Sequence, residues 1–442
     1  MHRRGNHPDF RHRNSQPNVA IEEIENELHA ILTPAAFAPL RKLSDHGDRA
    51  LRDRKLDLPT MTAVVLSLVL RSVVSQAELL RMLRHEGLLW SAPLDLSKQA
   101  LSKRFDTMPA SIFARLFDEV ITYYQHTQPS AAEPALGWWQ QQVDKAFTAV
   151  WSADTSTLEQ LRRTTKSLQS LQQSTHPLAG MIFAVVESFT ATPVCVEYRQ
   201  DQQTDELVFA TKLLEILPEQ GLVVFDKGFF QFALFDRFTE EQKYFLTRMR
   251  TQVRYEVIEV LAATPDYRDE IIVCGFYRSA PSRHRLRLVS VRWGKTWYQY
   301  VSNVLDPDRL SAEHLCQLYR SRWRIETAFN EVKRLLGLSY LWSGSSNGVE
   351  IQVYATWIIY TVLTHLCVDV ARGLGRSIET ISFEMVFRGL YHYSRSCSRA
   401  SGQEVSTFLI ENAKSLGIIK EHRNRQRLRD QQWRSIWGYT DA

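Results

Sequence analysis

The apolar residues of this 442-residue chain change their spacing twice, and this limits the fold more than any other feature. From about 19 to 130 they recur at three- and four-residue steps, which is typical of packed helices. Between 146 and 249, short apolar runs of strand length alternate with helical segments, and helical spacing returns at Ser311. This order predicts a mixed α/β fold with helical regions on either side.

The middle of the chain predicts three strands, a helix, a strand, a helix and a strand, in that order. The expected segments are strands over 146–153, 181–189 and 193–198, a helix over 204–217, a strand over 221–225, a helix over 231–238 and a strand over 243–249. Residues 252–304 are rich in Val, Ile, Tyr and Trp with turn residues between them. That composition indicates a small antiparallel β insertion.

These patterns predict six regions along the chain. We expect a disordered basic arm over 1–18, a helical region over 19–140, the first part of an α/β domain over 141–250, a β-rich insertion over 251–305, the second part of the α/β domain over 306–395 and a helical basic tail over 396–442. Arms and tails with such charge runs are usually solvated, and a DNA or subunit contact is the alternative.

Composition excludes several classes of protein. Apolar residues are 44% and charged residues 23% of the chain, as in ordinary globular proteins. Fifty-four Lys and Arg against 49 Asp and Glu give a net charge of +5, which permits a polyanionic partner without demanding one. Five scattered cysteines without a CxxC pair favour a reducing, cytoplasmic setting. The apolar runs 61–70 and 353–368 are too short to cross a bilayer, so we expect buried helices and a soluble protein without a membrane partner.

Residues 74–87 and 96–105 predict two helices joined by a short link, the second of them basic. Lys98, Lys103 and Arg104 are expected on or beside its exposed face, and Ser75 and Ser97 are candidate N-caps. The pattern is compatible with a helix-turn-helix that binds DNA through Lys103 and Arg104. An ordinary helical hairpin with a solvated basic face fits these residues equally well.

Three carboxylates are candidate metal ligands. Asp154 follows the first predicted strand, Asp226 follows the fourth, and Glu326 lies on the helix after the β insertion. If the first and fourth strands are neighbours, the two aspartates emerge side by side and a packed helix can add the third carboxylate. Oxygen ligands suit Mg²⁺ or Mn²⁺. Singly, each residue also fits a cap, a turn or a solvated helix position.

The helix around Glu326 groups four functional side chains. Tyr319, Arg322, Glu326 and Lys333 project within about 60° of one another at 100° per residue, beside an apolar stripe. Arg and Lys beside a metal-binding Glu suit a phosphate-backbone substrate. A structural ladder of salt bridges is the competing interpretation.

The pattern Tyr-x2-Arg-x3-Glu-x6-Lys resembles the signature of the DDE transposases of bacterial insertion sequences in the IS-four superfamily, relatives of the Tn-five transposase. All four positions match. The similar adjacent segments are 318–323, 325–326, Phe329, 301–303, 226–229 and 245–248. The resemblance covers roughly 146–370, and 97–106 is similar to the N-terminal region of that family.

The resemblance implies an RNase H-like catalytic domain, interrupted by the insertion, in which Asp154, Asp226 and Glu326 bind two Mg²⁺ or Mn²⁺ ions. It also implies that Tyr319, Arg322 and Lys333 contact phosphates at the transposon end. An aromatic side chain that stacks on a flipped base is a further family feature. Trp297, with Trp293 beside it, is the nearest candidate for that role. Two positions depart from the family pattern: Thr155 stands where many relatives have Gly, and Lys227 where Arg is common.

The function implied by the resemblance is DNA transposition. Such a protein binds terminal inverted repeats, cleaves the transposon ends by metal-dependent hydrolysis and joins the 3′-OH to target DNA, as a homodimer associated with the bacterial nucleoid. Two alternatives remain open. One is a catalytically silent DNA-binding regulator derived from a transposase, and the other is an RNase H-like nuclease that cuts without strand transfer.

Overall fold

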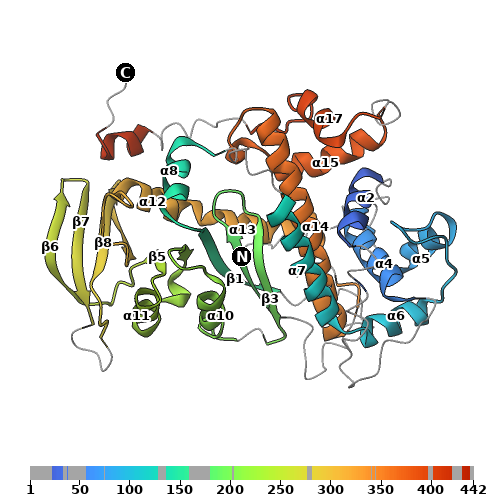
Figure 1. Cartoon of the computed structure of the whole chain (residues 1–442), viewed down its shortest axis with the longest axis horizontal. Helices are drawn as coiled ribbons and strands as arrows, with labels where there is room; N and C mark the ends of the chain where they lie inside the picture. Colours follow the sequence, from blue (N-terminus) through green and yellow to red (C-terminus); the bar gives the residue numbers. More distant parts are fainter. Residues whose placement is uncertain are drawn as a thin grey trace, which may run out of the picture.

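The computed structural model describes most of the chain (Figure 1). The described residues are 22–32, 37, 56–73, 75–127, 136–158, 180–201, 204–275, 281–339, 341–343, 345–396, 402–420 and 431–438. The predicted basic arm over 1–18 lies outside them, as do residues 421–430 of the basic tail.

One nine-stranded mixed sheet runs through the described residues, in the order β3-β2-β1-β4-β5-β9-β8-β7-β6. The strands are β1 (Val150–Leu158), β2 (Gly180–Glu187), β3 (Pro193–Arg199), β4 (Leu222–Phe225), β5 (Tyr244–Arg248), β6 (Tyr255–Ala263), β7 (Tyr267–Cys274), β8 (Leu286–Trp293) and β9 (Thr296–Ser302). β4 pairs in parallel with β1 and β5, whereas the other neighbours are antiparallel. The predicted mixed α/β class is confirmed, and the predicted β insertion extends the same sheet instead of forming a separate one.

Helices cover both faces of the sheet. On one face, α10 (Val208–Ile216) and α11 (Phe232–Glu240) share a phenylalanine-rich core in which the rings of Phe235 and Phe245 stack 4.2 Å apart. On the other face lie α8 (Trp138–Ala146), α12 (Ala312–Ser321) and α13 (Trp323–Asn330). Asp154 on β1 and Asp226, directly after β4, lie on the sheet between these two helical layers.

The long helix α14 (Ser346–Gly373) stands between the sheet and the N-terminal helices (Figure 1). Among the described residues it alone is long and apolar enough to cross a bilayer, and 94% of its most apolar window is buried inside the protein. The expectation of a buried core helix over 353–368 is therefore confirmed, although the helix is longer than the apolar run. The apolar run at 61–70 likewise lies in a buried helix.

The N-terminal helices pack on α14 and continue its hydrophobic core. They are α2 (Glu22–Ile31), α4 (Leu58–Leu70), α5 (Gln76–His85), α6 (Lys98–Thr107) and α7 (Ala110–Thr127). Both expected N-caps form: Ser75 Oγ accepts from the Glu78 amide at 3.2 Å and Ser97 Oγ from the Ala100 amide at 3.1 Å. Beyond α14 follow η4 (Ile378–Thr380), α15 (Phe383–Ser394), α17 (Val405–Glu411) and a short helix over 431–436.

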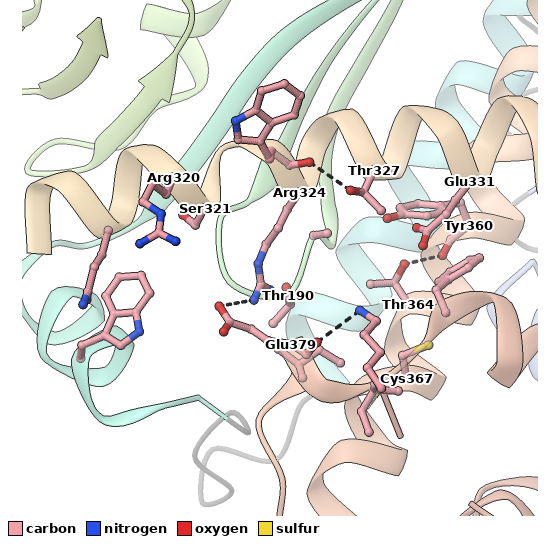
Figure 2. A pocket seen from close by; sticks show the side chains of 18 of the residues that line it. Thr190, Arg320, Ser321, Arg324, Thr327, Glu331, Tyr360, Thr364, Cys367 and Glu379 are labelled. Carbon is pink, nitrogen blue, oxygen red and sulfur yellow. Dashed lines mark hydrogen bonds and ion pairs between the residues drawn. The ribbon is translucent and has the colours of Figure 1, made fainter. Parts of the chain in front are cut away.

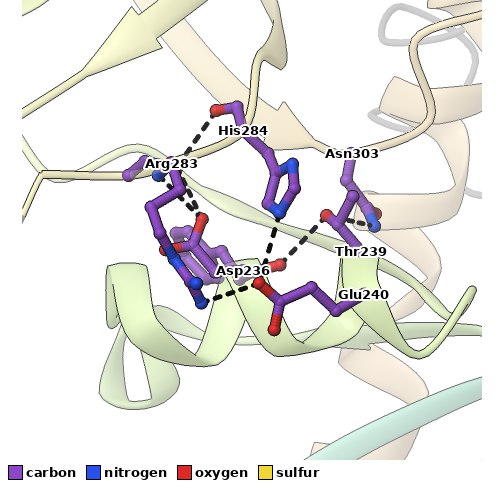
Figure 3. A network of polar contacts seen from close by, with 8 residues as sticks. Asp236, Thr239, Glu240, Arg283, His284 and Asn303 are labelled. Carbon is purple, nitrogen blue, oxygen red and sulfur yellow. Dashed lines mark hydrogen bonds and ion pairs between the residues drawn. The ribbon is translucent and has the colours of Figure 1, made fainter.

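The insertion is tied to α11 by a polar network (Figure 3). Asp236 Oδ1 accepts from the Arg283 amide at 2.9 Å, and the Arg283 guanidinium reaches Glu240 at 2.7 Å. Asn303, at the end of β9, donates to Thr239 Oγ1 at 3.2 Å and accepts from the Phe245 amide at 2.9 Å. These bonds join β5, β9 and α11, so the insertion is fixed relative to the first half of the sheet.

Candidate active site

Asp154 and Asp226 lie at neighbouring strand positions in the middle of the sheet. β1 and β4 are parallel and adjacent, and Ala153 is the register partner of Phe225. Each aspartate is the next residue after that pair, so the two are neighbours across β1 and β4, although β1 continues beyond Asp154 to Leu158. The condition that the sequence left open, that the first and fourth strands are neighbours, is met.

Asp154 is buried and held in a fixed orientation. The carboxylate is 8% exposed, accepts from the Thr155 amide at 2.8 Å and pairs with Arg322 Nη1 at 2.7 Å. Burial raises the pKa of Asp154 to about 7, and the nearby Asp226 and Glu326 carboxylates act in the same direction, while Arg322 and the Thr155 amide oppose it. The sequence predicted that the strand ends before Asp154. That prediction is wrong, because α8 extends to Ala146 and β1 runs from Val150 to Leu158.

Asp226 lies in a tight turn after β4. Its Oδ1 accepts from the Gly228 amide at 2.7 Å, which caps the short 3₁₀ turn η2 (Lys227–Phe229). Thr247 Oγ1, from buried β5, donates to the Asp226 carbonyl at 3.0 Å. The hydrogen bond from the Gly228 amide, which caps the turn, therefore also orients the Asp226 carboxylate.

Arg322 joins the sheet to Glu326. It stands between α12 and α13, is 7% exposed, and donates through Nη1 to Asp154 and through Nη2 to Glu326 Oε1 at 2.6 Å. One guanidinium therefore bridges two of the three candidate carboxylates. The Arg–Glu half of the predicted salt-bridge ladder is present, and the same arginine also reaches across to the sheet.

Tyr319 and Lys333 flank this pair on the same helical segment. The Tyr319 ring packs against Tyr300 of β9 with centroids 4.7 Å apart. Lys333 Nζ donates to Ser156 Oγ at 2.7 Å and to the Thr157 carbonyl at 2.6 Å, on the part of β1 beyond Asp154. Lys333 lies in a π-helical segment, η3 (Glu331–Leu335), so the helix does not keep the uniform 100° step that the sequence analysis assumed.

The other predicted site residues lie on different elements. Trp297 is on β9, is 41% exposed and has the Arg268 guanidinium 5.9 Å from its ring centre. Lys103 is exposed on α6. Arg104 is only 6% exposed, so its predicted position on the exposed face of α6 is wrong. It follows Leu101 by one helical turn and precedes Phe105, both of them buried, and therefore lies on the buried side.

Two residues beside the aspartates were missed by the sequence analysis. Glu206, just before α10, accepts from Thr155 Oγ1 at 2.6 Å, and Arg250 donates to the Lys227 carbonyl. Burial and the Asp226 carboxylate raise the pKa of Glu206, while the Thr155 hydroxyl opposes the shift. Glu206 follows Asp201 and Asp205 in an acidic stretch, and nothing in that pattern separates it from a solvated charge.

The donor set fits a hard divalent cation. Asp154, Asp226 and Glu326 offer carboxylate oxygens only, and the positive guanidinium already bound between two of them marks where positive charge is favoured. Among the described residues, no three His, Cys, Asp or Glu side chains are gathered closely enough to enclose a cation. The ligand type suits Mg²⁺ or Mn²⁺, whereas in the described arrangement Arg322 binds two of the three carboxylates and they do not enclose a cation site.

A cavity of about 680 Å³ is lined in part by residues of α12 and α13 (Figure 2). Arg320, Arg324, Glu331, Tyr360 and Glu379 are among its lining residues. Arg324 pairs with Glu379, and burial raises the pKa of Glu331 to about 7. None of the three candidate ligands lines this cavity, so it is separate from the candidate active site.

Comparison with known proteins places the similarity on the central part of the chain. Residues 169–362 match the family model described as "Transposase DDE domain", a range that includes Asp226 and Glu326 and begins after Asp154. The probable transposase for insertion sequence element IS5377 of Geobacillus stearothermophilus is 26% identical over 170 residues, which cover 37% of this chain and 44% of that protein. The putative transposase for insertion sequence element IS4SA of Synechocystis sp. is 24% identical over 170 residues, covering 37% and 47%. The chain therefore spans about half the length of the curated relatives it matches.

Proposed function

We propose, from the match of residues 169–362 to the transposase DDE domain model and from the similar transposases, that the protein is the DNA transposase of an insertion sequence. It would bind the terminal inverted repeats of its element, hydrolyse the phosphodiester bond at each end and join the freed 3′-OH to target DNA. The IS-four superfamily is the proposed subfamily, on the strength of the Tyr319, Arg322, Glu326 and Lys333 spacing.

We assign Asp154, Asp226 and Glu326 as ligands of two Mg²⁺ or Mn²⁺ ions. One observation carries this assignment: the parallel pairing of β1 with β4 sets two aspartates side by side, and Arg322 connects one of them to Glu326. Bound ions would supply an activated water and stabilise the leaving oxygen. The sheet order β3-β2-β1-β4-β5 supports an RNase H-like core for this site.

The roles of the basic residues follow from their present contacts. Arg322 is held by the same carboxylate oxygens that a divalent cation needs, so a cation and the guanidinium compete for them. A DNA phosphate beside the site gives the released guanidinium a new anionic partner. Tyr319 and Lys333, which flank Arg322 on the helical segment, are proposed to bind neighbouring phosphates.

The remaining assignments are also proposals. The N-terminal helices, with exposed Lys103 on α6, would hold the terminal repeats, and Trp297 would stack on a base at the transposon end. Two copies, one for each end of the element, would form the active complex on nucleoid DNA. Binding of this kind through phosphates weakens steeply as salt rises.

The substitution Asp226→Asn tests the proposed chemistry. It keeps the size of the side chain and an oxygen that can accept from the Gly228 amide, but it removes the charge that a cation needs. We expect nicking of DNA that carries the flanking inverted repeat to disappear in Mg²⁺ or Mn²⁺, while binding of that DNA stays close to wild type. Asp308→Asn, at an exposed loop position, is the matched control and should nick normally.

Nicking that survives in Asp226→Asn would show that the ligands are misassigned. The same assay separates the alternatives when a pre-cut end and a target DNA are supplied. A transposase yields a joined product, a nuclease cuts without joining, and a silent regulator shifts the DNA without cutting it.

A further inference from the structure

Glu206 contacts the segment that carries Asp154. The Thr155 hydroxyl donates to Glu206 Oε1 at 2.6 Å, and Thr155 is the residue directly after Asp154 on β1. Because successive side chains of a strand point to opposite faces, Thr155 points away from the Asp154 carboxylate and can be fixed without crowding it. A bond at Thr155 therefore anchors the part of β1 next to Asp154.

Glu206 also occupies the space over the turn that carries Asp226. A Cβ atom at Gly228 would lie 1.2 Å from Glu206 Oε2 and 2.9 Å from Asp226 Oδ1. The two carboxylates thus share the space over one glycine, and the absence of a side chain at position 228 admits Glu206. One acidic side chain touches both of the segments whose aspartates form the candidate metal site.

We propose that Glu206 is a positioning residue of the active site, which fixes β1 at Thr155 relative to the Asp226 turn by accepting the Thr155 hydroxyl and lying over Gly228. This inference rests on the proposed function, because it concerns the ligands of the same metal site. Glu206 itself is not a metal ligand in this proposal. Groups that orient ligands in this way commonly affect metal affinity by about 10- to 100-fold when they are removed.

The link is particular to this chain in one respect. It needs a hydroxyl at position 155, and a glycine after the first aspartate could not provide it. Thr155 and Glu206 are 51 residues apart, so the bond joins segments that chain connectivity does not hold together. We therefore expect substitutions at Thr155 and Glu206 to have coupled effects on metal binding, which neither single variant alone would reveal.

Binding of Mn²⁺ to the full chain without DNA, measured by titration calorimetry, tests the proposal. Glu206→Ala and Thr155→Val should each weaken Mn²⁺ binding about 10-fold. The double variant should be no weaker than the weaker single variant, since both substitutions break the same bond. Glu206→Gln keeps an oxygen acceptor for Thr155 and should lie nearer to wild type than Glu206→Ala does. Glu215→Ala, on the exposed side of α10, is the matched control and should bind as wild type.

Thermal melts in EDTA accompany each titration, so that a folding defect is recognised; Thr155→Val and Glu206→Gln are the conservative variants. The proposal is overturned if Thr155→Val binds Mn²⁺ like wild type, or if the two losses multiply in the double variant. It is also overturned if Glu206→Gln is as weak as Glu206→Ala, because the charge and not the hydrogen bond would then be responsible. A wild-type protein that fails to bind Mn²⁺ contradicts the proposed function instead.

Discussion

At the scale of single residues, Arg322 is the positive group that binds the candidate ligands when no cation is bound. Its guanidinium is almost fully buried and bonded to Asp154 and Glu326, so it offsets the repulsion between two carboxylates that face each other across the site. A buried charge pair of this kind is costly to break from one side, because the remaining charges are left without a partner.

Arg322→Gln is therefore expected to destabilise the protein in EDTA by about 2 kcal/mol, the usual cost of losing hydrogen bonds to charged groups. Urea unfolding measures the difference, and saturating Mn²⁺ should reduce it because the cation neutralises the same oxygens. Arg388→Gln removes an exposed pair with Glu384 of the same i,i+4 type and should change stability little. A larger loss for Arg388→Gln than for Arg322→Gln would contradict this account.

At this scale, the candidate ligands could be identified from the sequence, but not all of the residues that contact them. Asp154, Asp226 and Glu326 could be chosen because carboxylates at strand ends and on a helix stripe have a chemical meaning. Arg104 was misplaced although its spacing to Leu101 already indicated the buried side. Glu206 could not be found, because a contact made over a glycine in a distant turn leaves no trace in local spacing.

At the scale of elements, strand and helix types were predicted better than their ends. The apolar run from 146 to 153 combines the end of α8 with the start of β1, and a short apolar run fits either element. The break at Arg322 and the π-helical turn at Glu331–Leu335 both escaped the sequence analysis. Neither changes the alternation of polar and apolar residues, and so only tertiary packing reveals them.

The packing of α7 on α14 contains a buried histidine whose titration should be visible. His365 of α14 stacks on Tyr124 of α7 with ring centroids 3.9 Å apart, as expected for a core residue. Burial lowers the pKa of His365 to about 4, and Arg372 acts in the same direction. Below the ordinary histidine pKa of about 6.5, His365 binds a proton in the unfolded chain but remains neutral in the folded chain until the pH approaches its lowered pKa.

Stability should therefore fall as pH drops from about 6.5 towards 4, by at most about 1.4 kcal/mol per pH unit from this group. His365→Phe keeps an aromatic ring without the proton site, and the difference between wild type and variant removes the contributions of other titrating groups. Urea unfolding at a series of pH values measures this difference. Parallel pH profiles for the two proteins would show that His365 does not contribute.

At the scale of the whole molecule, the N-terminal helices share a core with α14 and the sheet. Buried residues of α4, α7 and α14 belong to one hydrophobic cluster, which also reaches β2. The sequence predicted a boundary near 140 from the change in spacing, because spacing reports which elements form and not which elements share a core. Compact domains that fold alone need a core of their own.

Removal of residues 1–136 should therefore expose the apolar side of α14. We expect the full chain to unfold in one cooperative transition, and the fragment 137–442 to aggregate or to lose a sharp transition in calorimetry. A fragment that melts cooperatively near the temperature of the full chain would show that the boundary near 140 separates independent folding units.

The unbroken hydrogen bonding from β4 through β5 to β9 has a mechanical consequence. Neighbouring strands are spaced about 4.8 Å apart, and a hydrogen-bonded ladder resists stretching. A DNA base bound at Trp297 of β9, as proposed above, would therefore lie at a distance from Asp226 that the two intervening strand spacings set. A longer loop in the insertion would leave this distance unchanged, because the pairing of β4, β5 and β9 does not depend on loop length.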